Sequence, residues 1–278
     1  MDFSPQDLTI RFTDDPKLST AVADALRAAE LIDAGYAFLA DLRSMRRAAH
    51  RASEAIYPAS VIKVAIMAEA FRRFARGDLR PDDRVTITPN NLTATDEPTP
   101  LVSGYAATLQ ELVELMIERS DNIATNQLID VLRRERITAS MHRLGLATFF
   151  LGRKLSGAEP LVEDPEMTGR NRLPPDEIGR LLTLIATDRV PGAAAQRAIL
   201  GTCRDRGKLS AGLLAGDRFM HKTGQTSDTS HDAGILETSA GARYVVVLYT
   251  VLPPAAGDDA SRVDSLMARW MRRLRQAL

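Results

Sequence analysis

The sequence predicts a mixed α/β fold in which strands from the two ends of the chain share one sheet around a helical insert. Two observations predict it: strand-like stretches occur only near the start and near the end, and the middle is mostly helical to about residue 189. A β-rich, helical, β-rich order favours helices packed beside a sheet. Five stretches have the composition of strands: Tyr36–Leu42, Arg47–Ala55, Arg218–Thr223, Ala233–Glu237 and Arg243–Leu252.

Helical spacing and capping residues predict the helices between and around these strands. Thr108-Leu-Gln-Glu111 is a capping box, in which a threonine and a glutamate satisfy the free N–H groups at a helix start. Another helix opens at Ser60. The remaining predicted helices are Leu18–Ile32, Asn122–Leu132, Pro175–Ile185 and Asp258–Leu278. Residues 151–173 have no clear periodicity and are expected to form a long functional loop, because structureless loops of that length are uncommon.

This order divides the chain into three parts. Residues 1–56 are expected to form the first part of an α/β domain, and residues 190–278 the second part. Residues 57–189 form the all-helical domain, which carries the long loop.

Composition and charge exclude several classes of function. The 278 residues include 36 Lys+Arg and 36 Asp+Glu, and a net charge of zero argues against a general nucleic-acid binder. One cysteine, Cys203, permits no disulfide within the chain. The four histidines lack metal-ligand spacing and no cofactor motif is present, so we expect neither a metal nor a cofactor.

The location of the protein is predicted from its apolar segments. The longest apolar run, residues 244–252, is too short to span a bilayer. The N-terminus shows no signal peptide. We therefore expect a cytoplasmic protein as the sequence stands, or a periplasmic or secreted one if a leader was removed.

Ser60 and Lys63 open a helix that is apolar on nearly every side. Such a helix is normally buried. In one interpretation Ser60 caps the helix and Lys63 extends its ammonium to solvent. In the other, the two side chains share a face, burial lowers the pKa of Lys63, and the neutral amine accepts the proton of the serine hydroxyl. This pattern alone leaves both open, because Ser-x-x-Lys arises by chance roughly once in a chain this long.

Two further motifs favour the catalytic interpretation. Ser120-Asp121-Asn122 links two predicted helices, and Lys222-Thr223-Gly224 ends a late strand. Helix capping and an ordinary strand end would explain either motif separately. Each tripeptide is expected by chance only about once in thirty such chains. Both together, in this order after Ser-x-x-Lys, indicate a catalytic site.

Together the three motifs resemble the signature motifs of class A β-lactamases and penicillin-binding proteins. The spacing is similar too, since 60 residues separate Ser60 from Ser120 and 102 separate Ser120 from Lys222. The resemblance extends from about Tyr36 to the C-terminal helix and includes Leu101-Val-Ser-Gly104. It implies an antiparallel sheet flanked by terminal helices, with an all-helical domain beside it, as in β-lactamases and transpeptidases.

The resemblance also implies roles for the motif residues in proton transfer. Ser60 would be the acylated nucleophile and Lys63 its proton partner. Ser120 would relay a proton to the leaving nitrogen. Asp121 is expected to order the link between two helices instead of taking part in the chemistry.

Other residues would bind the substrate. Asn122 would hydrogen-bond the substrate's side-chain amide, and Lys222 and Thr223 would hold its carboxylate. The backbone N–H groups of Ser60 and Gln225 would form the oxyanion hole.

The long loop departs from the family pattern. Class A enzymes carry Glu-x-x-Leu-Asn there, and its glutamate activates the water that hydrolyses the acyl-enzyme. This sequence has Glu159-Pro-Leu-Val-Glu163 instead, which keeps Glu-Pro and lacks Leu-Asn. Glu159 is the candidate for this role. Glu163, Asp164 and Glu166 are alternatives, and all four could simply be solvated loop acids.

Two other segments have ordinary structural interpretations. His231 falls where many members carry a basic residue near the carboxylate pocket, but a strand-end histidine paired with Asp232 is the preferred interpretation. Residues 201–208 imitate a phosphate-binding loop with one residue too many, and we interpret them as a surface turn.

Three functions are consistent with these residues. The first is a β-lactamase of the class A type that opens the ring of a small-molecule β-lactam through a Ser60 acyl-enzyme and releases it slowly. The second is a D-alanyl-D-alanine carboxypeptidase or a small-ester hydrolase with the same nucleophile. The third is a penicillin-binding protein that is acylated without turnover.

Overall fold

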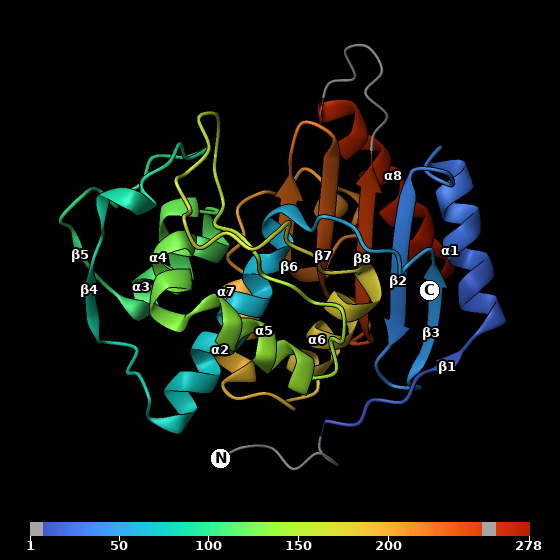
Figure 1. Ribbon diagram of the computed structural model, residues 1–278. Helices are drawn as coiled ribbons and strands as arrows, with labels where there is room; N and C mark the ends of the chain where they lie inside the picture. The colour runs from blue at the N-terminus through green and yellow to red at the C-terminus, as the bar shows by residue number, and fades with distance from the viewer. Residues whose placement is uncertain (1–7, 252–259) are drawn as a thin grey trace.

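The computed structural model describes residues 8–251 and 260–278 of the chain, and its centre is a six-stranded sheet. The strand order is β1–β3–β2–β8–β7–β6, so the sheet joins strands from both ends of the sequence (Figure 1). Neighbouring strands are antiparallel, except that β1 runs parallel to β3. The strands are β1 Thr13–Asp14, β2 Gly35–Asp41, β3 Arg46–His50, β6 Arg218–Gln225, β7 Thr229–Glu237 and β8 Arg243–Val251.

Two terminal helices cover one face of the sheet. Helices α1 (Pro16–Ala28) and α8 (Ala260–Ala277) contact each other and lie together at the right of Figure 1. Their apolar sides are buried with those of the sheet in one cluster that includes Leu26, Leu248 and Trp270. The amphipathic pattern of each helix thus places its apolar side on the sheet.

The helical part of the chain lies on the other side of the sheet (Figure 1). Helix α6 (Pro175–Ala186) contacts strands β2, β7 and β8. The other helices are α2 Lys63–Arg76, α3 Leu109–Glu118, α4 Asn122–Leu132, α5 Arg134–Arg143 and α7 Ala193–Leu200. A small two-stranded sheet pairs β4 (Arg84–Thr86) with β5 (Ala106–Thr108).

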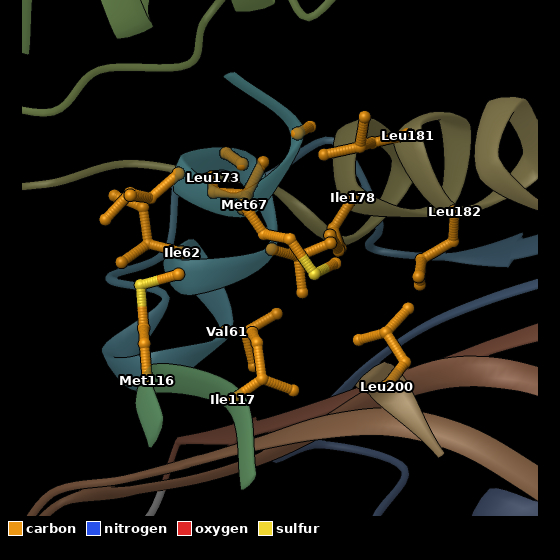
Figure 2. Close-up of a cluster of buried hydrophobic side chains, with 14 of the residues drawn as sticks. Val61, Ile62, Met67, Met116, Ile117, Leu173, Ile178, Leu181, Leu182 and Leu200 are labelled. Atoms are coloured by element: carbon orange, nitrogen blue, oxygen red, sulfur yellow. The ribbon is translucent and has the colours of Figure 1, made fainter. Parts of the chain in front are cut away.

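Helix α2 lies within the largest apolar cluster. Figure 2 shows Met67 of α2 among side chains from neighbouring elements, including Met116 of α3, Ile178 of α6 and Leu200 of α7. Residues 64–67 of α2 are completely buried. Because close-packed cores resist displacement, this packing fixes the position of the first turn of α2.

The predicted fold class is confirmed, with differences in the bounds of its elements. The predicted strand Arg47–Ala55 ends at His50, since Arg51 has a φ of +51°, which is outside the strand conformation. Strand β7 begins four residues before the predicted Ala233. Five helices and strands of the described residues were not predicted: β1, β4, β5, α5 and α7. The predicted ends at Leu252 and at residues 258–259 lie outside the described residues, and the three-part division of the chain stays a prediction.

No helix in the described part of the chain is both long enough and apolar enough to cross a membrane.

Candidate active site

Ser60 lies in a tight turn at the start of α2. The prediction that the α-helix opens at Ser60 is wrong by three residues: Ala59–Ile62 form the 3₁₀ turn η1, and α2 starts at Lys63. Ala59 has a φ of +45°, which non-glycine residues adopt only with strain. The turn therefore presents Ser60 at the edge of the buried helix, where its side chain is partly exposed.

Strand β6 approaches this turn closely because residue 224 is glycine. A Cβ at Gly224 would lie 3.0 Å from the backbone nitrogen of Ser60 and 3.1 Å from the carbonyl oxygen of Pro58. Both neighbours are backbone atoms, so a larger residue would push the strand away from the turn. The glycine of Lys222-Thr-Gly224 thus brings the third motif against the first.

Lys63 is fully buried and does not extend to solvent. Its Nζ donates to the backbone oxygen of Ser120 at 2.6 Å, to Ser120 Oγ at 3.1 Å and to Asn122 Oδ1 at 2.7 Å. Burial and then the nearby charge of Lys222 hold the pKa of Lys63 well below 10.5. The first two motifs therefore meet at an amine that can be neutral, as a proton acceptor must be.

The Ser120-Asp121-Asn122 motif is held by the start of α4. Ser120 has a φ of +58°, in the left-handed region, which costs a non-glycine residue roughly 1–3 kcal/mol. Asp121 caps α4, since its Oδ1 accepts from the backbone N–H of Ala124 at 2.9 Å, and its carbonyl accepts from Thr125 Oγ1 at 2.6 Å. Asp121 thus orders the link between the helices, as predicted.

Lys222 and Thr223 lie on β6 beside the turn. Lys222 is fully buried, and its Nζ donates to the Thr223 carbonyl at 2.8 Å. Burial lowers the pKa of Lys222, against which the charges of Cys203, Asp205, Asp232 and Asp96 act to raise it.

The three motifs share the wall of one cavity of about 200 Å³. Asn122 is not part of that wall and reaches the site through its hydrogen bond to Lys63. The predicted residues on the wall are Ser60, Ser120, Lys222, Thr223, Gly224 and Gln225.

The cavity also has an acidic wall that the sequence did not reveal. Arg119 and Cys203 line it as well. Arg204 joins two of the acids, Glu97 and Glu118, by ion pairs of 2.8 and 2.6 Å. The acidic wall residues are Asp96, Glu97, Glu118 and Asp205.

The predicted loop carboxylates do not line this cavity. Glu159 is exposed and does not line the cavity, nor do Glu163, Asp164 and Glu166. Asp164 is used structurally: its side chain forms an ion pair of 2.7 Å with Arg134. Burial raises the pKa of Asp164, but the hydrogen bonds from Arg134 and from the Lys154 N–H lower it overall.

The long loop is bonded to α4 through Leu155 and not through one of its acidic residues. Asn126 donates from Nδ2 to the Leu155 carbonyl at 2.8 Å and accepts from the Leu155 N–H at 2.9 Å. Asn126 lies one helical turn after Asn122 on the same face of α4. Leu155, which is only 4% exposed, is therefore tied to the same helix that carries Asn122.

His231 is a neutral, buried residue, and the predicted pairing with Asp232 is wrong. Its Nδ1 accepts from the Thr250 N–H at 3.2 Å, so its Nε2 donates to the Tyr57 carbonyl at 2.9 Å. Burial lowers the pKa of His231 to about 4. Asp232 pairs with His221 instead, at 2.8 Å, because successive residues of a strand, such as His231 and Asp232, face opposite sides.

Lys208 corrects the interpretation of residues 201–208 as a surface turn. Its neighbours 204–207 are exposed, but its own side chain is fully buried. Its Nζ donates to Gln225 Oε1 at 2.8 Å, to Ser230 Oγ at 2.7 Å and to Asp264 Oδ1 at 2.6 Å. Sequence reasoning missed this residue because its partners lie 17 to 56 positions away.

Among the described residues, no group of three or more His, Cys, Asp and Glu side chains is arranged to hold a metal ion.

Comparison with known proteins gives a family match over nearly the whole chain, to the kind of enzyme that the three motifs resemble. The model of a family described as the β-lactamase enzyme family matches residues 17–273. A search of curated protein sequences finds no match.

Solved structures share the fold throughout. PBP-A is 23% identical with a TM-score of 0.81, over 97% of this chain and 98% of PBP-A. An ancestral class A β-lactamase is 26% identical with a TM-score of 0.80, over 94% of this chain and 100% of that one. A β-lactamase from Sphaerobacter thermophilus is 24% identical with a TM-score of 0.79, over 93% and 97%.

Proposed function

The chain belongs to the β-lactamase enzyme family, and from this premise we propose that it opens β-lactam rings by the class A route, through an acyl-enzyme on Ser60. One observation carries the proposal. A buried lysine with a strongly lowered pKa follows the Ser60 turn and bonds to Ser120 and Asn122, and Ser60 and Ser120 both line one cavity. Burial of an amine among neutral acceptors suits proton transfer better than binding of an anion.

The proposed acylation uses five residues of this chain. Neutral Lys63 accepts the proton as Ser60 Oγ attacks the lactam carbonyl carbon. The negative oxygen that forms is stabilised by the N–H groups of Ser60 and Gln225. When the ring C–N bond breaks, Ser120 Oγ passes a proton to the leaving nitrogen, and Lys63 returns one to Ser120 across their 3.1 Å contact. Lys222 holds the substrate carboxylate.

Release of the acyl group is proposed to be slow. Hydrolysis needs a base within hydrogen-bond reach of a water at the acyl carbonyl. The part of the loop tied to α4 offers the buried hydrocarbon of Leu155, and Glu159 is exposed and does not line the cavity. A mutant of PBP-A, which shares the fold, forms an acyl-enzyme complex with penicillin G.

The same observation favours a second candidate function. A site that acylates readily and lacks a positioned base could act as a penicillin-binding protein. With a peptide or ester that leaves easily, it could act as a D-alanyl-D-alanine carboxypeptidase or a small-ester hydrolase.

Two assays test these functions. A chromogenic cephalosporin and a p-nitrophenyl ester are compared as substrates, and intact mass is measured after exposure to penicillin. We expect a stable mass increase of one penicillin per chain and slow cephalosporin turnover. Rapid ester turnover without any penicillin adduct would exclude the β-lactam function, and an adduct without any turnover would identify the penicillin-binding protein.

A further inference from the structure

We propose that an arginine-lined cavity between helices α2 and α5 binds a small organic diphosphate with an aliphatic body. The cavity has a volume of about 530 Å³, which is within the usual range for small-molecule sites. Most of its described lining residues belong to α2 and α5, which contact each other (Figure 1). The inference goes beyond the proposed function, because this cavity shares none of its described lining residues with the Ser60 cavity.

Positive charge is concentrated on the wall of this cavity, although the whole chain has 36 basic and 36 acidic residues. The described charged residues of the wall are five arginines and one acid: Arg72, Arg73, Arg76, Arg136, Arg143 and Asp78. Guanidinium groups present forked N–H donors that match the oxygens of a phosphate group. The composition of the wall therefore favours an anion.

The spacing of the arginines favours an anion with more than one charged group. Arg72 and Arg76 are four residues apart on α2, and Arg136 and Arg143 are seven residues apart on α5, with Ser140 between them. Such spacings place side chains on one face of a helix. At a rise of 1.5 Å per residue, the two arginines of α5 lie about 10 Å apart along the helix. A diphosphate suits that span better than a single phosphate does.

Arg136 has a position that ordinary helix capping does not explain. Cations are favoured in the last turn of a helix, where Arg73, Arg76 and Arg143 lie. Arg136 is the third residue of α5, in the first turn, where the helix dipole disfavours a cation. Its exposed side chain has no acidic partner among the described residues. A bound anion would provide one.

Arg73 has a hydrogen-bond donor without an acceptor at this wall. Its Nε is buried and donates to no atom of the described residues. Its Nη1 forms an ion pair of 3.3 Å with Asp78, which also lies 3.4 Å from Arg76 Nε. Arg72, by contrast, is already paired with the buried Glu69 at 2.7 Å. A bound anion would thus supply the acceptor that Arg73 lacks.

The remaining wall is mostly aliphatic, and none of the described lining residues is aromatic. The apolar residues are Leu8, Ala68, Ala139, Met141, Leu144, Val190 and Pro191. A nucleotide base would find no aromatic ring to stack on, whereas an aliphatic chain would bury its methylene groups against these side chains. The wall therefore favours an aliphatic diphosphate over a nucleotide.

The N-terminal residues of the chain are the alternative occupant. Leu8 lines the cavity, and the residues before it include Asp2 and Asp7. The variant Asp2→Asn/Asp7→Asn removes both carboxylates and so distinguishes this occupant from an external anion.

The experiment measures binding by isothermal titration calorimetry with isopentenyl diphosphate, pyrophosphate, ADP and citrate. Pyrophosphate tests the anionic group alone, ADP replaces the aliphatic body by a nucleoside, and citrate has a similar charge without phosphorus. The variants are Arg136→Gln, Arg143→Gln and the double variant. The control Arg43→Gln/Arg84→Gln removes two exposed arginines that do not line the cavity.

We expect micromolar binding of isopentenyl diphosphate, several-fold weaker binding of pyrophosphate and ADP, and roughly 10-fold weaker binding of citrate. Each single variant should weaken isopentenyl diphosphate binding about 10-fold, the scale of one hydrogen bond to a charged group. The double variant should lose more than either, and the control should match the wild type. Citrate binding of equal affinity, tighter binding of ADP, or unchanged binding by the double variant would overturn the proposal.

Thermal unfolding checks that each variant is folded. If the glutamine variants fail to fold, Arg136→Lys, which keeps the charge and lacks the forked donors, should still weaken binding several-fold, and normal binding by it would overturn the proposal. Binding by Asp2→Asn/Asp7→Asn without binding by the wild type would identify the N-terminal residues as the occupant and overturn it too, as would no binding by either. The test involves no β-lactam chemistry, so its outcome is independent of the proposed function.

Discussion

Replacing Lys63 by arginine is expected to reduce acylation by at least about 100-fold, the usual scale for loss of a general base. Arginine keeps the charge and much of the stem, but a guanidinium does not lose its proton at working pH. Lys63 has a lowered pKa through burial and the charge of Lys222, and its acceptors at 2.6–3.1 Å leave no room for a larger head group without displacement.

The pH dependence follows from the same pKa. In the wild type, the acylation rate should fall as pH falls through the lowered pKa of Lys63, because the protonated amine cannot accept from Ser60. The unfolded chain has the ordinary value of 10.5 and binds more protons between the two values. The Lys63 contribution to the free energy of unfolding therefore rises with pH across that window and is lost below the lowered pKa.

The assay is stopped-flow acylation by a chromogenic cephalosporin from pH 5 to pH 10, with Lys17→Arg as the control variant. Circular dichroism checks that Lys63→Arg is folded. Acylation by the folded variant within a few-fold of the wild-type rate would refute the assignment of Lys63 as the proton acceptor. The assignment would also be refuted if the acylation rate of the folded Lys63→Arg variant fell at low pH in the same way as that of the wild type.

Four further outcomes are expected. Ser60→Ala should not be labelled by fluorescent penicillin, and labelling at the wild-type rate would mean another nucleophile. Glu159→Gln should leave both the burst and the slow steady rate of cephalosporin hydrolysis unchanged, whereas loss of the slow rate would restore its role. Leu155→Glu should raise the steady rate at least several-fold by placing a carboxylate beside α4, and an unchanged rate in the folded variant would contradict that position. Ampicillin, which carries an ammonium, should acylate the enzyme a few-fold faster than carbenicillin, which carries an extra carboxylate, because the cavity has an acidic wall. The double variant Asp96→Asn/Asp205→Asn and high salt should each reduce this preference, and equal rates at low salt would contradict the prediction.

Motif order was sufficient to predict which elements meet at the cavity. Ser60, Ser120 and Lys222 lie far apart in the sequence, yet each is on the wall. Their local signals are strong because a helix start, a helix cap and a close-approach glycine each restrict the residue type. The fold class followed from the distribution of strands for the same reason, since side-chain periodicity is a local property.

Residues whose role depends on distant contacts could not be predicted. Lys208 is next to exposed residues in sequence, and only the return of α8 and β7 buries it. In the long loop, the Glu-Pro pair suggested Glu159, whereas the loop is anchored to α4 through the backbone of Leu155. Because these hydrogen bonds use the backbone of Leu155, they place no requirement on its side chain that a sequence pattern could reveal.

The two buried lysines of the site, Lys63 and Lys222, are proposed to have different roles, one in proton exchange and the other in binding an anion. The acceptors of Lys63 are a carbonyl, a hydroxyl and an amide, all neutral, and its pKa is lowered well below 10.5. Lys222 is equally buried and also donates to a neutral carbonyl, and nearby acidic groups act to raise the pKa of both lysines against the effect of burial. Each lysine also disfavours the charged form of the other, as the effect of Lys222 on Lys63 shows. We therefore expect Lys63 to be the lysine that gives up its proton and Lys222 to stay charged, because the pKa of Lys63 is the more strongly lowered.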